Sequence, residues 1–312
     1  MRSAAHLVVI GNFDGFHRGH QALLAAAARE AMAGGLGPRV LTFTPHPAKV
    51  LGRTPPPVLT RPERKRELIR RAFPTVEVVE QTFDLGFAAL SPDQFAEWLA
   101  REQGAARVVV GQNFRFGKGR AGGFDDLVRL GAVHGFRATF EPLVGDDGGA
   151  WSSTRIRNAI AAGDLPAAER MLGRPHVLIG EVGRGKQLGR TIGMPTANLD
   201  AVEEMLPPFG VYATLVDVVE AGRPRALGLG AMSIGVNPTT DDTTDVKAEV
   251  NVLDFDGDLY GRTLRVSLIA RIRGEERFDS LDALVAQMRV DVASCRDALA
   301  GREPDPSTGS FG

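Results

Sequence analysis

The first half of the chain alternates short apolar runs with longer stretches of helical periodicity. Five apolar runs, rich in β-branched residues, predict buried strands at residues 8–10, 39–43, 76–79, 107–111 and 136–140. Three stretches between them predict helices at residues 19–33, 62–72 and 91–103. Strands that alternate with helices over short connections form βαβ units, so this half predicts an α/β domain with a parallel sheet.

The pattern changes after Gly173-Arg174-Pro175. Five apolar stretches then follow one another with turns between them, at residues 176–182, 210–219, 226–236, 246–254 and 263–271. No long helical pattern intervenes until residues 280–300, so this half predicts a small antiparallel β-barrel with one terminal helix. We therefore predict domains at 1–173 and 174–300, followed by a polar, disordered tail at 301–312.

The composition narrows the class of protein. The 312 residues are 43% hydrophobic and 24% charged, with a net charge of −1, which is ordinary for a globular protein. That charge creates no field that attracts nucleic acid or an anionic membrane, so a phosphate site must be local. The single cysteine, Cys295, excludes an internal disulfide, and no apolar run is long enough for a membrane span. We expect a cytoplasmic protein without nucleic-acid or membrane partners, and a weak homo-oligomer stays open.

The first predicted strand runs into the sequence G-N-F-D-G-F-H-R-G-H, from Gly11 to His20. A helix is predicted to begin near Gly19, and His17 and His20 are three residues apart, so they share one helical face. Two imidazoles above a helix N-terminus can donate hydrogen bonds to charge that develops on phosphorus. Paired histidines at a helix start are also found as a cap or as surface residues, but the strand–turn–helix context favours a phosphate site.

Two loops follow other predicted strands at the edge where ligands bind in α/β sheets. The sequence T-P-H-P at residues 44–47 interrupts regular structure. A proline-rich loop without a binding function would show the same pattern. Residues 112–122 are rich in glycine and carry three basic residues, which suits an anion. Phe114 and Phe116 in that loop are costly to expose without a partner. By contrast, the mixed charges of the helix at 62–72 indicate a solvated face, not a nucleic-acid site.

A second helix start has the sequence S-S-T-R-I-R at residues 152–157. A cap explains one serine, but it does not explain a second serine, a threonine and two arginines. We therefore predict a second phosphate site at this helix terminus.

The predicted barrel has its own phosphate-binding pattern. The turn from Gly183 to Gly193 contains glycines and basic residues but lacks the P-loop sequence. Thr196 and Asn198 lie two apart on one side of an extended segment, where their neutral oxygens suit Mg²⁺ with phosphates and water, or are incidental to a Pro-Thr turn. Glu249 is a carboxylate on an apolar strand, so it needs a partner, and it is a candidate general base.

Several motifs together resemble the prokaryotic bifunctional riboflavin kinase/FAD synthetases, over residues 7 to 300. The short H-x-G-H sequence alone resembles the wider nucleotidyltransferase superfamily. The longer matches are G-N-F-D-G-F-H-R-G-H, T-F-T-P-H-P, F-R-F-G-K-G-R-A-G, S-S-T-R-I-R, G-R-T-I-G-M-P-T-A-N, S-I-G-V-N-P-T and A-E-V-N-V-L-D-F. Thr44 stands where the family usually has an acidic residue, and Asn251 where it commonly has histidine.

This resemblance implies a Rossmann-like nucleotidyltransferase domain followed by a riboflavin kinase-like barrel. The barrel would phosphorylate riboflavin to FMN with ATP and Mg²⁺, and the first domain would transfer AMP from a second ATP to FMN, giving FAD and pyrophosphate. The catalytic residues implied are His17, His20, Arg155 and Glu249, and the Mg²⁺ ligands are Thr196 and Asn198. The flavin-binding residues implied are Phe43, Pro45, His46, Pro47, Phe114, Asn237 and Arg277. The nucleotide-binding residues implied are Gly11, Phe13, Asp14, Gly19, Asn113, Arg115, Ser152, Ser153, Thr154, Arg157, Gly183, Lys186, Gly189, Arg190 and Gly193.

Two other functions are compatible with parts of this pattern. One is an H-x-G-H transferase that adenylylates another phosphorylated cofactor precursor, which the sequence Pro195-Thr196-Ala197-Asn198 argues against. The other is a non-catalytic flavin-binding regulator. The presence of both complete sets of polar residues argues against that interpretation.

Overall fold

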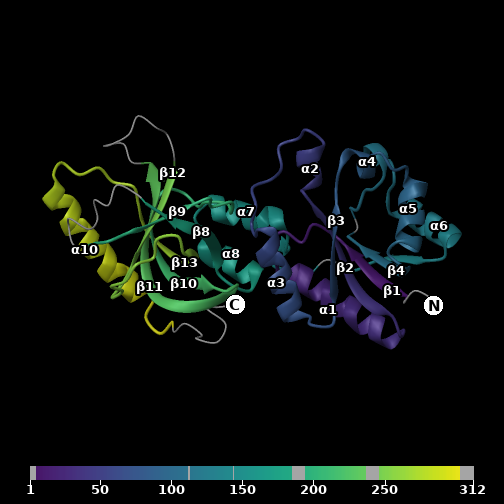
Figure 1. The fold of residues 1–312 in the computed structure, drawn as a ribbon, viewed down its shortest axis with the longest axis horizontal. Helices are drawn as coiled ribbons and strands as arrows, with labels where there is room; N and C mark the ends of the chain where they lie inside the picture. Colours follow the sequence, from purple (N-terminus) through teal and green to yellow (C-terminus); the bar gives the residue numbers. More distant parts are fainter. Residues whose placement is uncertain (1–4, 112, 143, 185–193, 237–245, 303–312) are drawn as a thin grey trace. The chain divides into compact units, whose positions relative to one another are not determined.

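A computed structural model describes residues 5–111, 113–142, 144–184, 194–236 and 246–302. The chain divides into two compact units, residues 1–152 and 153–312 (Figure 1). This division groups the two helices after residue 152 with the barrel. The boundary at residue 173, which marks the change in hydrophobic pattern, stays a prediction. The predicted disorder of the tail concerns residues 303–312, which lie outside the described residues.

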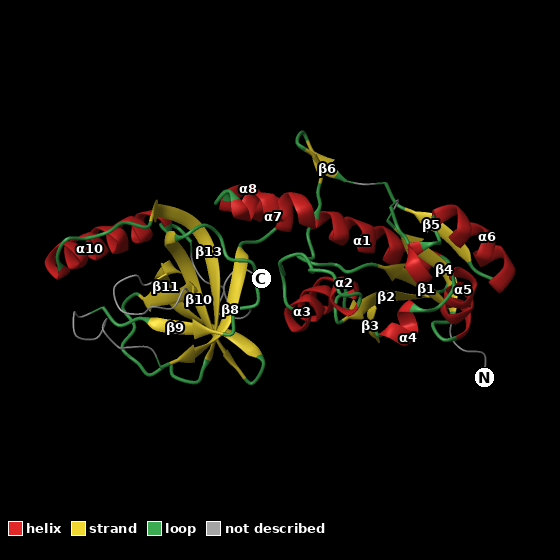
Figure 2. Cartoon of the chain, turned by 90° about the horizontal axis from the view of Figure 1, so that it is seen from above, coloured by secondary structure: helices red, strands yellow, loops and turns green. Residues whose placement is uncertain are grey.

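The first unit is built on a parallel five-stranded sheet in the order β3-β2-β1-β4-β5 (Figure 2). Its strands are β1 His6–Ile10, β2 Gly37–Thr44, β3 Glu77–Thr82, β4 Ala105–Val110 and β5 Arg137–Phe140. The central strand β1 is apolar on both faces because helices cover both. The predicted parallel sheet is therefore confirmed.

Alternation along β1 divides the core of this unit into two layers. Leu7 and Val9 face a cluster with α1 and α3, whereas Val8 and Ile10 face a cluster with α5 and α6. The helices are α1 Arg18–Ala33, α2 Pro47–Val50, α3 Pro62–Ala72, α4 Leu85–Ala88, α5 Pro92–Arg101 and α6 Phe124–His134. A short hairpin, β6 Gly145–Asp146 and β7 Gly149–Ala150, ends the unit. Helix α5 begins after its N-cap Ser91, whose hydroxyl accepts the N–H of Gln94 at 3.2 Å.

The prediction that the charges of α3 form a solvated face holds for Glu63, Arg70 and Arg71, which are exposed, but is wrong for two other residues. Arg64 is only 5% exposed and Lys65 only 7% exposed. A mixed-charge pattern identifies the polar side chains, but partners on other elements decide which of them are buried.

The second unit begins with two helices and continues as a closed barrel in the order β10-β11-β12-β9-β8-β13. Its helices are α7 Ser153–Ala161, α8 Leu165–Leu172 and the terminal α10 Leu281–Ala298. The strands are β8 His176–Gly183, β9 Ala197–Asp200, β10 Gly210–Glu220, β11 Arg223–Val236, β12 Val246–Val252 and β13 Thr263–Gly274. All the pairings are antiparallel, which confirms the predicted barrel and its terminal helix.

Strand β10 is apolar on both faces because each face is covered. Tyr212 and Val216 belong to the interior cluster of the barrel, whereas Ala213 and Leu215 pack on the outside with Cys295 of α10. Burial raises the pKa of the Cys295 thiol to about 12, so this cysteine is a packing residue. Leu165 of α8 also joins the interior cluster and ties this helix to the barrel.

Candidate active sites

The two histidines of the H-x-G-H sequence meet at the first turn of α1. His17 is the N-cap, with Nδ1 accepting the N–H of His20 at 3.4 Å, and its side chain is buried. The two rings are stacked, with centroids 3.7 Å apart and an interplanar angle of 20°. Because Nδ1 is an acceptor, the neutral His17 ring carries its proton on Nε2. His17 is therefore both the cap and a potential hydrogen-bond donor to phosphate.

The glycine between these histidines is tightly enclosed by its neighbours. A Cβ at Gly19 would lie 3.0 Å from Cε1 of His17 and 3.2 Å from the carbonyl oxygen of Trp151. The guanidinium of Arg18 lies 6.0 Å from the centroid of the Trp151 ring, and Nε1 of Trp151 donates to Asp146 at 3.1 Å. The backbone that leads into Ser152 therefore lies beside the start of α1. Trp151 was not among the predicted site residues.

The other predicted residues of this turn hold its shape. The amide of Gly11 donates to the carbonyl of Leu41 at 3.1 Å. Phe13 has a φ of 52°, is buried, and its ring meets that of His20 edge to face at 5.1 Å. The carboxylate of Asp14 accepts the N–H groups of Leu59 and Thr60, each at 3.1 Å.

The T-P-H-P loop is connected to this turn. His46 caps α2 by accepting the N–H of Ala48 on Nδ1 at 3.1 Å, and its Nε2 lies 3.2 Å from the side-chain amide of Asn12. Pro45 and Pro47 flank His46, and Pro47 is the first residue of α2. Phe43, at the end of β2, packs against Phe83 and Phe87 with ring centroids 5.7 and 5.9 Å away. The loop and the H-x-G-H turn thus form one connected surface of the first unit.

The loop after β4 corrects one expectation. Phe114 and Phe116 stack with centroids 5.7 Å apart, and Phe116 packs against Phe95 of α5 at 5.2 Å. These side chains have partners within the fold, so their cost of exposure is no argument for a ligand. Asn113 and Arg115 are exposed, and their binding of a nucleotide stays a prediction.

The S-S-T-R-I-R sequence forms the start of α7, as predicted. Ile156 and Ile160 are buried, Thr154 is exposed, and Ser152, Ser153, Arg155 and Arg157 are half-buried. The expected closure of these residues over the H-x-G-H turn stays a prediction.

Three predicted residues of the barrel lie in register across adjacent strands. Gly183 of β8 pairs with Asn198 of β9, and Asn198 pairs with Glu249 of β12. Glu249 accepts a hydrogen bond from the hydroxyl of Thr196, with Oγ1 3.2 Å from Oε2. The carboxylate on this apolar strand therefore has its expected partner, on a residue 53 positions away in the chain.

Glu249 and Asn251 share the face of β12 opposite to the buried Val250, as the alternation predicts. The amide Nδ2 of Asn251 donates to the carbonyl of Pro195 at 2.6 Å. This contact fixes the backbone next to Thr196. Asn251 therefore connects the β12 site residues to the segment that carries the predicted Mg²⁺ ligands.

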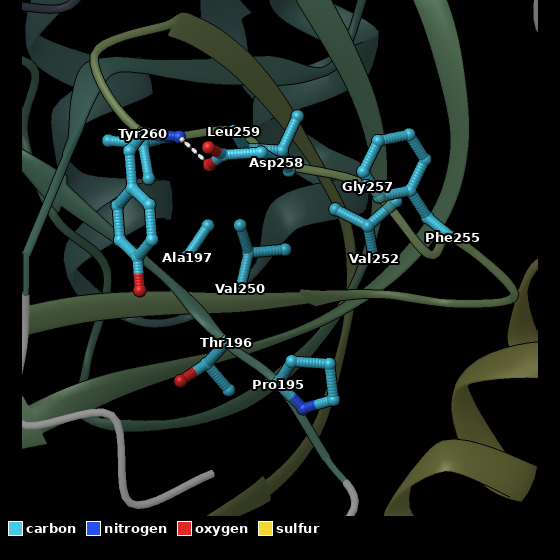
Figure 3. Close-up of a pocket in the computed structure, with 11 residues that line it drawn as sticks. Pro195, Thr196, Ala197, Val250, Val252, Phe255, Gly257, Asp258, Leu259 and Tyr260 are labelled. Carbon is cyan, nitrogen blue, oxygen red and sulfur yellow. Dashed lines mark hydrogen bonds between the residues drawn. The ribbon is translucent and has the colours of Figure 1, made fainter. Parts of the chain in front are cut away.

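A pocket opens beside Thr196 (Figure 3), lined by Val182, Pro195, Thr196, Ala197, Val250, Val252, Phe255, Gly257, Asp258, Leu259 and Tyr260. Asp258 accepts the N–H of Tyr260 at 3.0 Å, and the Arg184 guanidinium lies 5.8 Å from the Tyr260 ring centroid. The start of the glycine-rich turn therefore borders the pocket. Phe255, Asp258 and Tyr260 were not among the predicted site residues, although Phe255 ends the A-E-V-N-V-L-D-F sequence and the other two closely follow it.

Gly183 lies at the end of β8, where a Cβ would lie 1.8 Å from Oδ2 of the exposed Asp200 side chain and would displace that carboxylate. Arg277 is exposed after β13. Five predicted binding residues lie outside the described residues: Lys186, Gly189, Arg190, Gly193 and Asn237.

Comparison with known proteins covers both units. The FAD synthetase family model matches residues 2–155, and the riboflavin kinase family model matches residues 172–299. A bifunctional riboflavin kinase/FMN adenylyltransferase from Pseudomonas fluorescens is 39% identical over 94% of this chain and 93% of its own length. The protein of the same name from Escherichia coli strain K12 is 38% identical over 96% of this chain and 94% of its own length.

A crystal structure described as a macrolide-efflux protein from Streptococcus pneumoniae has a similar fold. It matches with a TM-score of 0.80 and 32% sequence identity, over 95% of each chain. Within the part of the chain that the structure describes, no helix is long and apolar enough to cross a membrane.

Proposed function

Because the chain belongs to the family of bifunctional riboflavin kinase/FMN adenylyltransferases, we propose that each of its two reactions has its own set of residues. The enzyme phosphorylates riboflavin to FMN and adenylylates FMN to FAD, with ATP as a substrate of both reactions. Membership of this family argues against the two alternative functions, a transferase for another cofactor and a non-catalytic regulator. The family matches on either side of residues 156–171 support a domain boundary near residue 173.

The kinase reaction is assigned to the barrel. The 5′-hydroxyl of riboflavin attacks the γ-phosphorus of ATP, Glu249 accepts the hydroxyl proton, and ADP leaves. The hydrogen bond from Thr196 orients the Glu249 carboxylate. Such phosphoryl transfer depends mostly on positioning and charge neutralisation.

The donors beside Glu249 fit Mg²⁺. Thr196 and Asn198 would hold the ion through neutral oxygens, and phosphates and water would complete its ligands. Bound there, Mg²⁺ neutralises charge on the phosphates of ATP. The pocket beside Thr196 is apolar on the side of Val250 and Val252, which suits the base of the nucleotide.

The adenylyl transfer is assigned to the H-x-G-H turn. A phosphate oxygen of FMN attacks the α-phosphorus of ATP, and pyrophosphate leaves. The FMN phosphate is anionic at neutral pH, so this step needs no general base. His17 donates from Nε2 and, with His20, stabilises charge on the α-phosphoryl group, while Ser153, Thr154 and Arg155 hold the phosphates.

The observation that carries this assignment is the Thr196–Glu249 hydrogen bond, which unites two separate motifs of the kinase signature. The test is a time course with riboflavin, ATP and Mg²⁺, in which chromatography separates FMN from FAD. We expect FMN to form first and FAD after it, and we expect FMN formation to stop when Mg²⁺ is chelated. FAD formation without any FMN would contradict the two-step assignment.

Two further expectations belong to this proposal. The solitary, buried Cys295 fits a reducing compartment, so we place the enzyme in the cytoplasm. Riboflavin, FMN, FAD and ATP are its partners, and we propose no nucleic-acid or membrane partner.

A further inference from the structure

A lysine is buried beneath the turn that precedes α1. Lys65 lies on α3 and is 7% exposed. Its ammonium donates to the backbone carbonyl of Asn12 at 3.0 Å and to the hydroxyl of Thr42 at 3.1 Å. The Thr42 hydroxyl is itself 3.4 Å from the same carbonyl. Lys65 therefore joins α3 to the turn after β1, at Asn12, and to the neighbouring strand β2, at Thr42.

This arrangement is costly as a packing device. Burial lowers the pKa of the Lys65 ammonium, and the charges of Glu80 and Asp14 act in the opposite direction. An apolar side chain would fill the same space without desolvating a cation, and such replacements are often neutral for stability. The presence of an ammonium at this position is therefore best explained by its hydrogen bonds to the Asn12 carbonyl and the Thr42 hydroxyl.

Asn12 has contacts on both sides of the backbone that Lys65 holds. Its side-chain amide lies 3.2 Å from Nε2 of His46, in the T-P-H-P loop. One residue later, Phe13 adopts a φ of 52° and packs against the ring of His20. A rotation of the Asn12 peptide would therefore move both the His46 contact and the start of the turn.

We propose that Lys65 is a positioning residue for adenylyl transfer: it fixes the Asn12 carbonyl and so fixes the turn that carries His17 and His20. The inference rests on the proposed function of that turn. Lys65 acts through the backbone and touches no substrate. Its effect on the reaction comes from the placement of groups that act in the transition state, where displacements of about 1 Å can cost 10²-fold in rate.

The central variant is Lys65→Met, which keeps most of the side-chain volume and removes the donors. We expect its kcat for FAD formation from FMN to fall by about 10- to 100-fold. We expect its melting temperature to stay within a few degrees of wild type, because loss of the hydrogen bonds is offset by loss of the buried charge. FMN formation from riboflavin should be unchanged, which gives an internal control in the same chain.

Two further variants separate positioning from stability. Lys65→Arg restores a cationic donor, so we expect it to recover part of the lost kcat. Arg39→Met is the matched control in the same unit. Arg39 donates to Glu77 at 2.7 Å and to the carbonyl of Gln103 at 2.7 Å, near the amino-terminal ends of the strands. We expect this variant to lower the melting temperature and to keep the wild-type kcat.

Wild-type kcat in folded Lys65→Met would overturn the proposal, and so would an equal loss of kcat in Arg39→Met. If Lys65→Met does not fold, Lys65→Gln is measured with the same expectation, because its amide is one bond too short to reach the Asn12 carbonyl. The double variant His17→Ala, His20→Ala tests the site itself. Full FAD synthesis in that variant would refute the proposed site, whereas its inactivity beside an active Lys65→Met would refute only Lys65.

Discussion

The H-x-G-H turn and the barrel site are both proposed to bind the phosphates of ATP, but their side chains are of different kinds. At the turn, two stacked imidazoles lie at a helix start. In the barrel, a carboxylate is hydrogen-bonded to a threonine hydroxyl and is paired in register with an asparagine. The proposed nucleophiles explain this difference. The phosphate of FMN is already an anion and needs only donors, whereas the hydroxyl of riboflavin has a proton to lose and needs a base.

The two sites also differ in how the chain assembles them. The H-x-G-H residues are contiguous, so a single strand–turn–helix brings them together. The barrel site takes residues from three strands, and only the register of β8, β9 and β12 makes them neighbours. The H-x-G-H site therefore depends mainly on one local segment, whereas the barrel site depends on an intact barrel.

The largest expected effect comes from separating the units. A fragment of residues 153–312 should make FMN at nearly the wild-type rate and no FAD. A fragment from residue 176 should make FMN but melt at a lower temperature, since it lacks Leu165, which belongs to the barrel core. Chromatographic assays and thermal melting of both fragments test this comparison. A folded 153–312 fragment that makes no FMN would contradict the assignment of the kinase to the barrel.

The next effect tests the base. Glu249→Gln keeps an acceptor for the Thr196 hydroxyl but cannot take a proton, so kinase turnover should fall by about 10²- to 10⁴-fold. FAD formation from added FMN should not change. The measurement is turnover at saturating riboflavin and ATP, with thermal melting as the control. Unchanged turnover would remove Glu249 from the catalytic residues, and a large loss of stability would favour a structural function.

The histidines should have an effect of about 10²- to 10³-fold, on FAD formation alone. Because His17 is also the N-cap of α1, His17→Ala should in addition cost about 1 kcal/mol of stability. His17→Asn is the matched control, since asparagine is a good cap without an imidazole. Both variants should lose FAD formation, but only His17→Ala should lose the cap. Recovery of the rate in His17→Asn would mean that His17 acts as a cap only.

The smallest effect concerns Asn251. Asn251→Ala removes its hydrogen bond to Pro195, which is worth about 1 kcal/mol, so we expect a change of about fivefold. The change should appear in the KM for ATP in the kinase assay, because Thr196 adjoins Pro195. Asn251→His introduces the residue common in the family. Its KM for ATP should lie between those of the wild type and Asn251→Ala. An unaltered KM in Asn251→Ala would show that Pro195 keeps its place without this contact.

The sequence was sufficient where information is local. The period of the apolar residues predicted the parallel sheet and the barrel, and the contiguous H-x-G-H turn was recognisable as a candidate site. The pairing of Thr196 with Glu249 was not predictable, because it depends on strand register across 53 residues. Lys65 was missed because its partners, Asn12 and Thr42, lie on other elements. The shortest helices, α2 and α4, contain too few residues for a period.

A mixing experiment tests the central claim, that the two reactions use separate and independent sites. Glu249→Gln and the double variant His17→Ala, His20→Ala are each incubated with riboflavin, ATP and Mg²⁺, alone and together. Alone, the first should form little FMN, and the second should accumulate FMN without FAD. Together they should form FAD, because FMN released by one chain is adenylylated by the other. A mixture that forms no FAD, although each chain keeps its own remaining reaction, would contradict the independence of the two sites.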